Sequence, residues 1–163
     1  MAKNFQITEE MKSQIGWTSK PWTYEVSRSS VRAFARGVGY TDLVYFDVNT
    51  AKKAGYRDLP APPTYLGTAI FIPGKSDDNL PRDPETSPKI DHGLKGMLDG
   101  STETEYLEQI CAGDTLTCIT TLTDMTTKGS IVLGTTLVIS TESTFSNQDG
   151  KVMAIQRKQI IFY

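Results

Sequence analysis

Two carboxylates, Asp42 and Asp47, stand close together in the polar stretch Gly39–Thr64 and are the first candidates for proton chemistry. A carboxylate can take a proton from water near neutral pH where burial raises its pKa. The same residues also suit structural roles, because Asp42 lies in a turn-like segment and Asp47 precedes a helix-like one. The sequence therefore leaves a catalytic and a structural interpretation open for both.

Two tyrosines, Tyr40 and Tyr45, stand five positions apart in the same stretch. Because the pKa of a tyrosine is near 10, only about one phenol in a thousand is ionised at pH 7. Two phenols therefore cannot replace a carboxylate and an imidazole as base and acid. With an apolar ring and a polar tip, they can line a ligand site, form a hydrogen bond across an interface or simply pack.

The chain has a single histidine, His92, and two cysteines, Cys111 and Cys118. One histidine excludes sites with several histidine ligands and leaves little for a serine or cysteine triad, so we expect no metal. His92 lies between Asp91 and Gly93 and is predicted to be a solvated loop residue. The cysteines, seven apart, do not form a disulfide framework or a zinc ribbon, and both are expected to be reduced, with Cys118 in the core.

Length and charge narrow the class of protein further. The 163 residues predict one domain, residues 1–163. A net charge of −2 with scattered basic residues gives no footprint for nucleic acid. No apolar run approaches the roughly 20 residues of a membrane span, and Met1–Glu10 lacks the regions of a signal peptide, so we expect a soluble, cytoplasmic protein without membrane contact.

The N-terminal half predicts a strand and short helices. Trp22–Val26 alternates like a strand, and Ser27–Ser30 supplies caps for a helix that ends at Gly37 or Gly39. Asp47 is predicted to cap a second helix that runs through Ala54 and ends at Gly55.

Leu59–Thr64 is rich in proline, so it should be stiff and extended. Pro63 is well placed to open a further helix that runs to Ile72, and the free amides at its start are candidate donors to a ligand. Residues 73–97 are predicted to form a long exposed excursion, because the segment is polar and rich in proline and aspartate.

The C-terminal half has strand patterns, predicted at Ser101–Gln109, Thr115–Asp124, Ser130–Thr144 and Lys151–Phe162. Turn signals at Cys111–Asp114 and Asn147–Gly150 are each expected to join antiparallel neighbours. Helices first and an antiparallel sheet afterwards indicate an α+β fold. Glu103 and Glu105 fit an exposed strand face, and Asp114 fits a turn.

Gly39–Thr64, Leu98–Gly100 and Ala112–Leu116 together resemble the MaoC-like hydratase/dehydratase family. The resemblance covers roughly Trp22–Phe162. It implies a hot-dog fold, in which an antiparallel sheet wraps around a central helix, here Pro63–Ile72. It also implies fatty acid metabolism, with an acyl thioester of coenzyme A or acyl carrier protein as the substrate and no further cofactor.

The family's catalytic pattern, Gly-Asp-x-Asn-Pro-x-His, stands here as Gly39-Tyr40-Thr41-Asp42-Leu43-Val44-Tyr45, so Tyr40 and Tyr45 replace the acid and the histidine. The chain therefore resembles the N-terminal-type, degenerate domains of (R)-specific enoyl-CoA hydratases and hydroxyacyl thioester dehydratases. The resemblance implies a non-catalytic half that shapes the acyl tunnel beside a partner hot-dog with an intact Asp/His dyad. Tyr40, Tyr45, Pro63 and Thr64 are the expected substrate-binding residues.

Two other functions stay open. The chain is a self-sufficient homodimeric hydratase or hot-dog thioesterase if Asp42 or Asp47 serves as the carboxylate, or it binds acyl thioesters without transforming them. A homodimer or a heterodimer is expected in each case, because hot-dog sheets usually bury a face in a dimer. Basic residues before and beside the prolines could meet the phosphates of coenzyme A or the acidic helix of a carrier protein: Arg32, Arg36, Lys52, Lys53 and Arg57.

Overall fold

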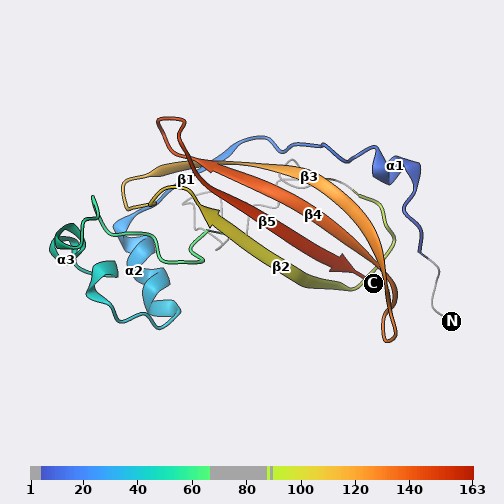
Figure 1. The fold of residues 1–163 in the computed structure, drawn as a ribbon, viewed down its shortest axis with the longest axis horizontal. Helices are drawn as coiled ribbons and strands as arrows, with labels where there is room; N and C mark the ends of the chain where they lie inside the picture. Colours follow the sequence, from blue (N-terminus) through green and yellow to red (C-terminus); the bar gives the residue numbers. More distant parts are fainter. Residues whose placement is uncertain (1–4, 67–87, 89) are drawn as a thin grey trace.

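A five-stranded antiparallel sheet, ordered β1-β3-β4-β5-β2, runs the length of the molecule, and α2 and α3 gather at one end of it (Figure 1). The computed structural model describes residues 5–66, 88 and 90–163. The strands are β1 (Trp22–Glu25), β2 (Met97–Tyr106), β3 (Thr115–Ser130), β4 (Gly134–Ser146) and β5 (Val152–Phe162). The helices are α1 (Glu9–Lys12), α2 (Arg28–Gly37), the short 3-10 helix η1 (Leu43–Tyr45) and α3 (Val48–Lys53). No helix in these ranges is long and apolar enough to cross a membrane.

Both predicted N-terminal helices are confirmed, because side chains in the sequence satisfy their free ends. Ser27 caps α2: its hydroxyl accepts the backbone N–H of Ser30 at 3.0 Å, and the Ser30 hydroxyl accepts the N–H of Ser27 at 3.1 Å. Asp47 caps α3 by accepting the N–H of Thr50 at 2.7 Å. After α3 the chain turns at Gly55, whose φ of +93° favours glycine.

The pairing of the strands corrects one prediction. Asn147–Gly150 joins β4 and β5, which are antiparallel neighbours as expected. Cys111–Asp114 does not join neighbours, because β2 pairs with β5 at one edge of the sheet and β3 lies between β1 and β4. The connection therefore crosses from one side of the sheet to the other. Its turn is held by the Asp114 carboxylate, which accepts the N–H of Cys111 at 2.9 Å.

The predicted strand Ser130–Thr144 begins too early. In the structure β3 continues to Ser130, and Ile131–Leu133 form the turn of a long hairpin with β4. The Ser130 hydroxyl accepts the N–H of Leu133 at 3.1 Å, and Gly134 has a φ of +78° that closes the turn. Ile131 is fully exposed at the tip.

The proline-rich segment is extended, as predicted, but Pro63 does not open a helix. Ala61 donates its N–H to the carbonyl of Ile110, and Ala112 donates to the carbonyl of Leu59, both at 2.8 Å. Thr64 then adopts a φ of +67°, in the left-handed region, so the chain turns there. Residues 67–72 of the predicted central helix, and residues 73–87 and 89 of the predicted excursion, lie outside the described residues.

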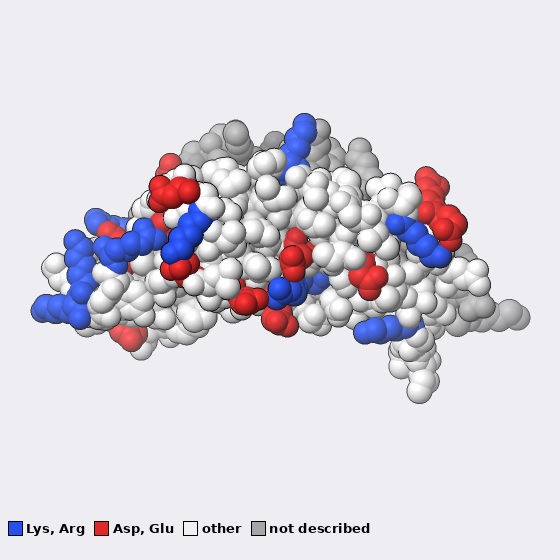
Figure 2. Space-filling model, turned by 45° about the horizontal axis from the view of Figure 1, so that its top comes forward, with Lys and Arg blue, Asp and Glu red and all other residues white. Residues whose placement is uncertain are grey.

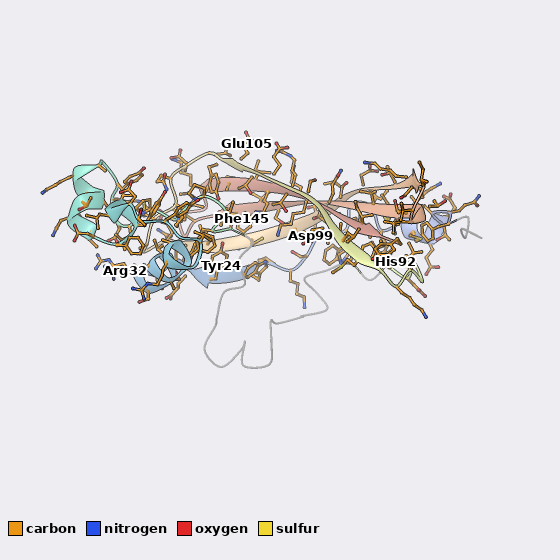
Figure 3. The ribbon with its side chains drawn as sticks, turned by 90° about the horizontal axis from the view of Figure 1, so that it is seen from below. Tyr24, Arg32, His92, Asp99, Glu105 and Phe145 are labelled. Atoms are coloured by element: carbon orange, nitrogen blue, oxygen red, sulfur yellow. The ribbon has the colours of Figure 1, made fainter. Side chains whose placement is uncertain are left out.

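Two buried clusters occupy opposite ends of the sheet. The first joins α2, α3 and the proline-rich segment to Tyr24, Phe145 and Ala154. The second includes Met11, Leu122, Leu137 and Ile139, with Phe162 partly buried against it. We call the face that carries Tyr24 and Phe145 the inner face. Figure 3 shows Glu105 on the opposite side of the sheet from Tyr24 and α2.

The buried carboxylate of Asp114 provides a test of the fold. Its Oδ2 binds the Arg57 guanidinium, and its Oδ1 is buried without a hydrogen-bond partner among the described residues. Arg57→Ala leaves this charge uncompensated and should lower the free energy of unfolding by about 1–3 kcal/mol. The loss is smaller than for a fully buried ion pair, because the Arg57 side chain is half exposed. Denaturant titration measures the change.

Arg57→Lys, which keeps the charge, should lose less than Arg57→Ala, whereas Lys53→Ala on the exposed side of α3 should have no measurable effect. Equal stability of the wild type and Arg57→Ala would show that the pair does not hold the turn.

Candidate functional site

A half-open pocket of about 490 Å³ lies between the inner face of the sheet and the end of the proline-rich segment. We call it the inner-face pocket. Its lining comes from three parts of the chain: Pro63 and Thr64 from the segment with Leu66 just after it, Thr102, Thr104 and Tyr106 from β2, and Gln156 and Lys158 from β5. Pro63 and Thr64, two of the expected substrate-binding residues, are thus brought to a pocket. Its volume is in the range of small-molecule sites.

Gln156 holds the two sides of this pocket together. It is 1% exposed, and its side-chain amide donates to the Thr104 hydroxyl at 2.9 Å and to the backbone carbonyl of Leu66 at 3.3 Å. A buried amide must find partners, so these bonds fix the segment against β2 and β5. Gln156 therefore positions the pocket wall.

Gln156 also belongs to a polar band that crosses the inner face between the two buried clusters. Register places Thr120 opposite Ser143, Ser143 opposite Gln156, and Gln156 opposite Thr104. The hydroxyls of Thr120 and Ser143 lie 2.8 Å apart, within hydrogen-bond distance. Four neighbouring strands thus carry polar side chains at the level where the pocket opens.

Tyr40 and Tyr45 lie against each other rather than in the pocket lining. Their rings stack with centroids 5.3 Å apart and an angle of 23° between the planes. Burial, then the neighbouring Tyr40, raises the pKa of Tyr45 above its ordinary value. Tyr45 is therefore still less able than free tyrosine to supply a base near pH 7. Tyr106 lines the pocket, and its pKa is raised mainly by burial and in part by Tyr40.

Asp42 and Asp47 are both exposed and both serve as caps. Asp42 accepts the N–H of Val44 at 3.0 Å at the start of η1. Asp47 binds both the N–H and the hydroxyl of Thr50, and these hydrogen bonds lower its pKa. A base formed by burial needs the opposite shift, so this geometry favours the structural role of Asp47.

His92 lies in a loop, as predicted, but its side chain is only partly exposed. Its ring packs on Phe162 with centroids 4.2 Å apart, and its Nδ1 accepts the N–H of Leu94 at 3.1 Å. Burial lowers the pKa of the imidazole below its ordinary value. Figure 3 places His92 at the end of the sheet opposite α2, away from the tyrosine pair. The one imidazole of this chain is therefore used in packing.

The remaining candidates have structural places. Both cysteines are free and buried, as expected, and burial raises the pKa of Cys118 and of Cys111. Glu103 and Glu105 lie on the exposed outer face, where Arg157 forms an ion pair with Glu105 at 3.2 Å. In the described part of the chain, no three His, Cys, Asp or Glu side chains are grouped so that they could hold a metal ion.

Sequence reasoning missed the β-strand side of the pocket. Thr102, Thr104, Gln156 and Lys158 were not singled out, although the two residues of each strand stand at alternate positions and so share one face. The available signal lay in β5, where the polar Gln156 and Lys158 stand at alternate positions between the apolar Ala154 and Ile160.

Comparison with known proteins identifies relatives by sequence. The family model for the FAS1-like dehydratase domain region matches residues 13–156. A UPF0336 protein of Parafrankia sp. (strain EAN1pec) is 34% identical over 132 residues, which cover 80% of this chain and 79% of that protein.

Solved structures have the same fold. The HadBC (3R-hydroxyacyl-ACP dehydratase) complex from Mycobacterium tuberculosis matches with a TM-score of 0.68 at 19% identity, covering 91% of this chain and 96% of that one. The ChsH1–ChsH2 complex from the same organism matches with a TM-score of 0.71 at 21% identity, covering 90% and 84%. MaoC-like dehydratases match as well. The predicted α+β hot-dog fold is confirmed.

The ion pair at the start of the proline-rich segment predicts a dependence of stability on pH. Asp58 binds the Arg28 guanidinium at 2.7 Å and accepts the N–H of Leu59 at 2.8 Å. These contacts lower the pKa of Asp58 to about 2. Because the folded pKa lies below the unfolded value of about 3.9, the stabilisation is present above about pH 4 and is lost as the pH falls toward 2.

Thermal melts from pH 2.5 to 5 should therefore show a smaller acid destabilisation in Asp58→Asn than in the wild type. Asp149→Asn, in the exposed β4–β5 turn, is the matched control and should follow the wild type. Parallel curves for the wild type and Asp58→Asn would contradict the role of the ion pair.

Proposed function

Because this chain belongs to the family of FAS1-like dehydratase regions, within the MaoC-like hot-dog proteins, we propose that it is a subunit of an (R)-specific enoyl thioester hydratase or 3-hydroxyacyl thioester dehydratase. In this proposal it is the half without the acid/base pair. It shapes the site for the acyl group, and a second hot-dog subunit carries out the proton transfers.

One observation carries the proposal: a hot-dog scaffold with a formed pocket has a stacked pair of phenols, Tyr40 and Tyr45, where the catalytic pattern implied by the family resemblance has an acid and a histidine. Hydration of an enoyl thioester requires a base that takes a proton from water while its oxygen bonds to the β-carbon, and an acid that gives a proton to the α-carbon. Neither phenol is suited to the first step, and His92 lies at the other end of the sheet.

The edge strand β2 supports a partner. Among the described strands it pairs only with β5, and nine of its ten residues are exposed. An edge strand of this length is a ready template for pairing with another chain. Two of the matched structures are complexes named for two subunits, HadBC and ChsH1–ChsH2. The proposed partner is therefore a hot-dog subunit, and β2 is the proposed contact edge.

The charge distribution supports a carrier with phosphate groups as part of the substrate. Residues 28–58 hold six basic and three acidic side chains in a chain of net charge −2. Figure 2 shows Lys and Arg gathered at the end of the molecule where α2 and α3 lie. Arg28 and Arg57 bind Asp58 and Asp114, which leaves Arg36, Lys52 and Lys53 exposed for an anion. The proposed substrate is an acyl thioester of coenzyme A or acyl carrier protein.

Co-expression with a MaoC-like hot-dog subunit that has the intact Gly-Asp-x-Asn-Pro-x-His pattern tests the function. The complex should hydrate enoyl thioesters, followed by loss of enoyl absorbance, and this chain alone should not. Removing the partner's acid or histidine should lower kcat by about 100-fold or more.

Asp42→Asn and Asp47→Asn keep the caps and should change kcat by no more than about twofold. Full activity from this chain alone, abolished by either substitution, would replace the proposal with a self-sufficient enzyme. Thioester binding without turnover in every complex would leave a binding module.

A charge reversal tests the basic end. Lys52→Glu with Lys53→Glu should raise KM for an acyl-CoA substrate by roughly threefold to tenfold at low ionic strength, and the effect should shrink as salt screens the charges. Lys95→Glu with Lys128→Glu makes the same charge change away from α2 and α3 and should leave KM unchanged. Equal KM values for both double variants would remove the basic end from substrate binding.

A further inference from the structure

The wall of the inner-face pocket is more polar than its surroundings. Thr102 and Thr104 on β2 face Lys158 and Gln156 on β5 in direct register. The inner-face positions beyond this level belong to the two apolar clusters. A pocket shaped only for an alkyl chain would continue the apolar lining. The polar side chains therefore indicate a ligand with polar groups of its own.

Among the described residues, the hydrogen bonds in this wall leave hydroxyl and ammonium donors available. Gln156 uses its side-chain N–H groups on Thr104 and on the Leu66 carbonyl. The Thr104 oxygen acts as the acceptor in this bond, so its own O–H remains to be donated. Lys158 lines the same pocket and adds an ammonium group with donors only.

No carboxylate of the described chain neutralises Lys158. The glutamates of β2 and β4 lie on the outer face, where Arg157 binds Glu105 and Glu142 at 3.2 and 2.9 Å. Asp99 pairs across from Ile160, the next inner-face position along β5, and forms no ion pair with Lys158. Among the described residues, the pocket thus combines a positive charge and hydroxyl donors without a matching acid.

We propose that the inner-face pocket binds a part of the acyl thioester that carries an anionic acceptor group, held by Lys158 and Thr104. The inference rests on the proposed function, since it specifies the substrate of the same site. The anion is a carboxylate on the acyl chain, distant from the thioester, and the same chemistry would also fit a phosphate of coenzyme A.

The geometry and the energetics agree with this assignment. Two residues of the lining, Tyr106 and Thr102, are four residues apart on β2, roughly 13 Å along the strand. A ligand that extends from Tyr106 along the pocket would place its far end beside Thr102 and Lys158. An alkyl end there would remove water from these donors without replacing its hydrogen bonds, whereas a carboxylate would form charge-assisted bonds with them.

Calorimetric titration with N-acetylcysteamine thioesters tests the inference, because these probes carry no phosphate. A chain with a terminal carboxylate and the matched alkyl chain are titrated into the protein and into its complex with the hot-dog partner. The carboxylate probe should bind at least about 10-fold more tightly than the alkyl probe. Lys158→Met should remove this preference, and Lys158→Arg should retain most of it.

Arg157→Met is the matched control, because residue 157 is the neighbour of Lys158 on the opposite face of β5. It should keep the preference for the carboxylate probe. Free coenzyme A is titrated in parallel to test whether the anion is a phosphate instead. The anion site would be assigned to the phosphate of coenzyme A if coenzyme A binding is lost in Lys158→Met and the two thioesters bind equally well. Equal or tighter binding of the alkyl probe, with no binding of coenzyme A at Lys158, would overturn the anion site.

These outcomes separate the inference from the proposed function. If the alkyl probe binds as well as the carboxylate probe and coenzyme A does not bind at Lys158, the anion site fails and the acyl thioester role stands. If no thioester binds to the chain or to the complex, both fail. If the carboxylate preference is found in an inactive complex, the anion site stands and the hydratase role fails.

Discussion

The buried amide of Gln156 is the constraint on which the candidate site depends. An amide that is 1% exposed must satisfy its donors inside the protein, and here it does so with Thr104 on one strand and Leu66 on the proline-rich segment. One side chain on β5 therefore joins the sheet to a segment that is distant in sequence. The width of the pocket and the position of Thr64 follow from this connection.

The parts of the fold that the sequence predicted are those set by neighbouring residues. Ser27 and Asp47 were identified as caps because a cap satisfies backbone donors two or three positions away. Gly55 was identified as a terminator because a left-handed φ favours glycine. The family resemblance, carried by Gly39–Thr64, added the hot-dog architecture that no local pattern contains.

The parts that were missed depend on contacts between distant segments. The turn at Cys111–Asp114 looks like a hairpin in sequence, but register with β5 decides the place of β2. Proline suggested a helix after Pro63, whereas Thr64 turns the chain to the left-handed region. In the sequence, Lys158 cannot be distinguished from an ordinary surface lysine. The pairing of β2 with β5 places it in a pocket wall. Such residues gain their meaning from tertiary structure.

The exposed edge of β2 has a consequence for how much of this protein a cell can tolerate. Among the described residues no strand pairs with the outer edge of Met97–Tyr106, so until the proposed partner covers this edge its backbone presents N–H and C=O groups that an extended chain can join. A subunit made in excess would meet other copies of itself before it meets a partner. If the proposed complex forms, balanced synthesis of its two subunits would limit such encounters, so control of their stoichiometry would act as protection against aggregation.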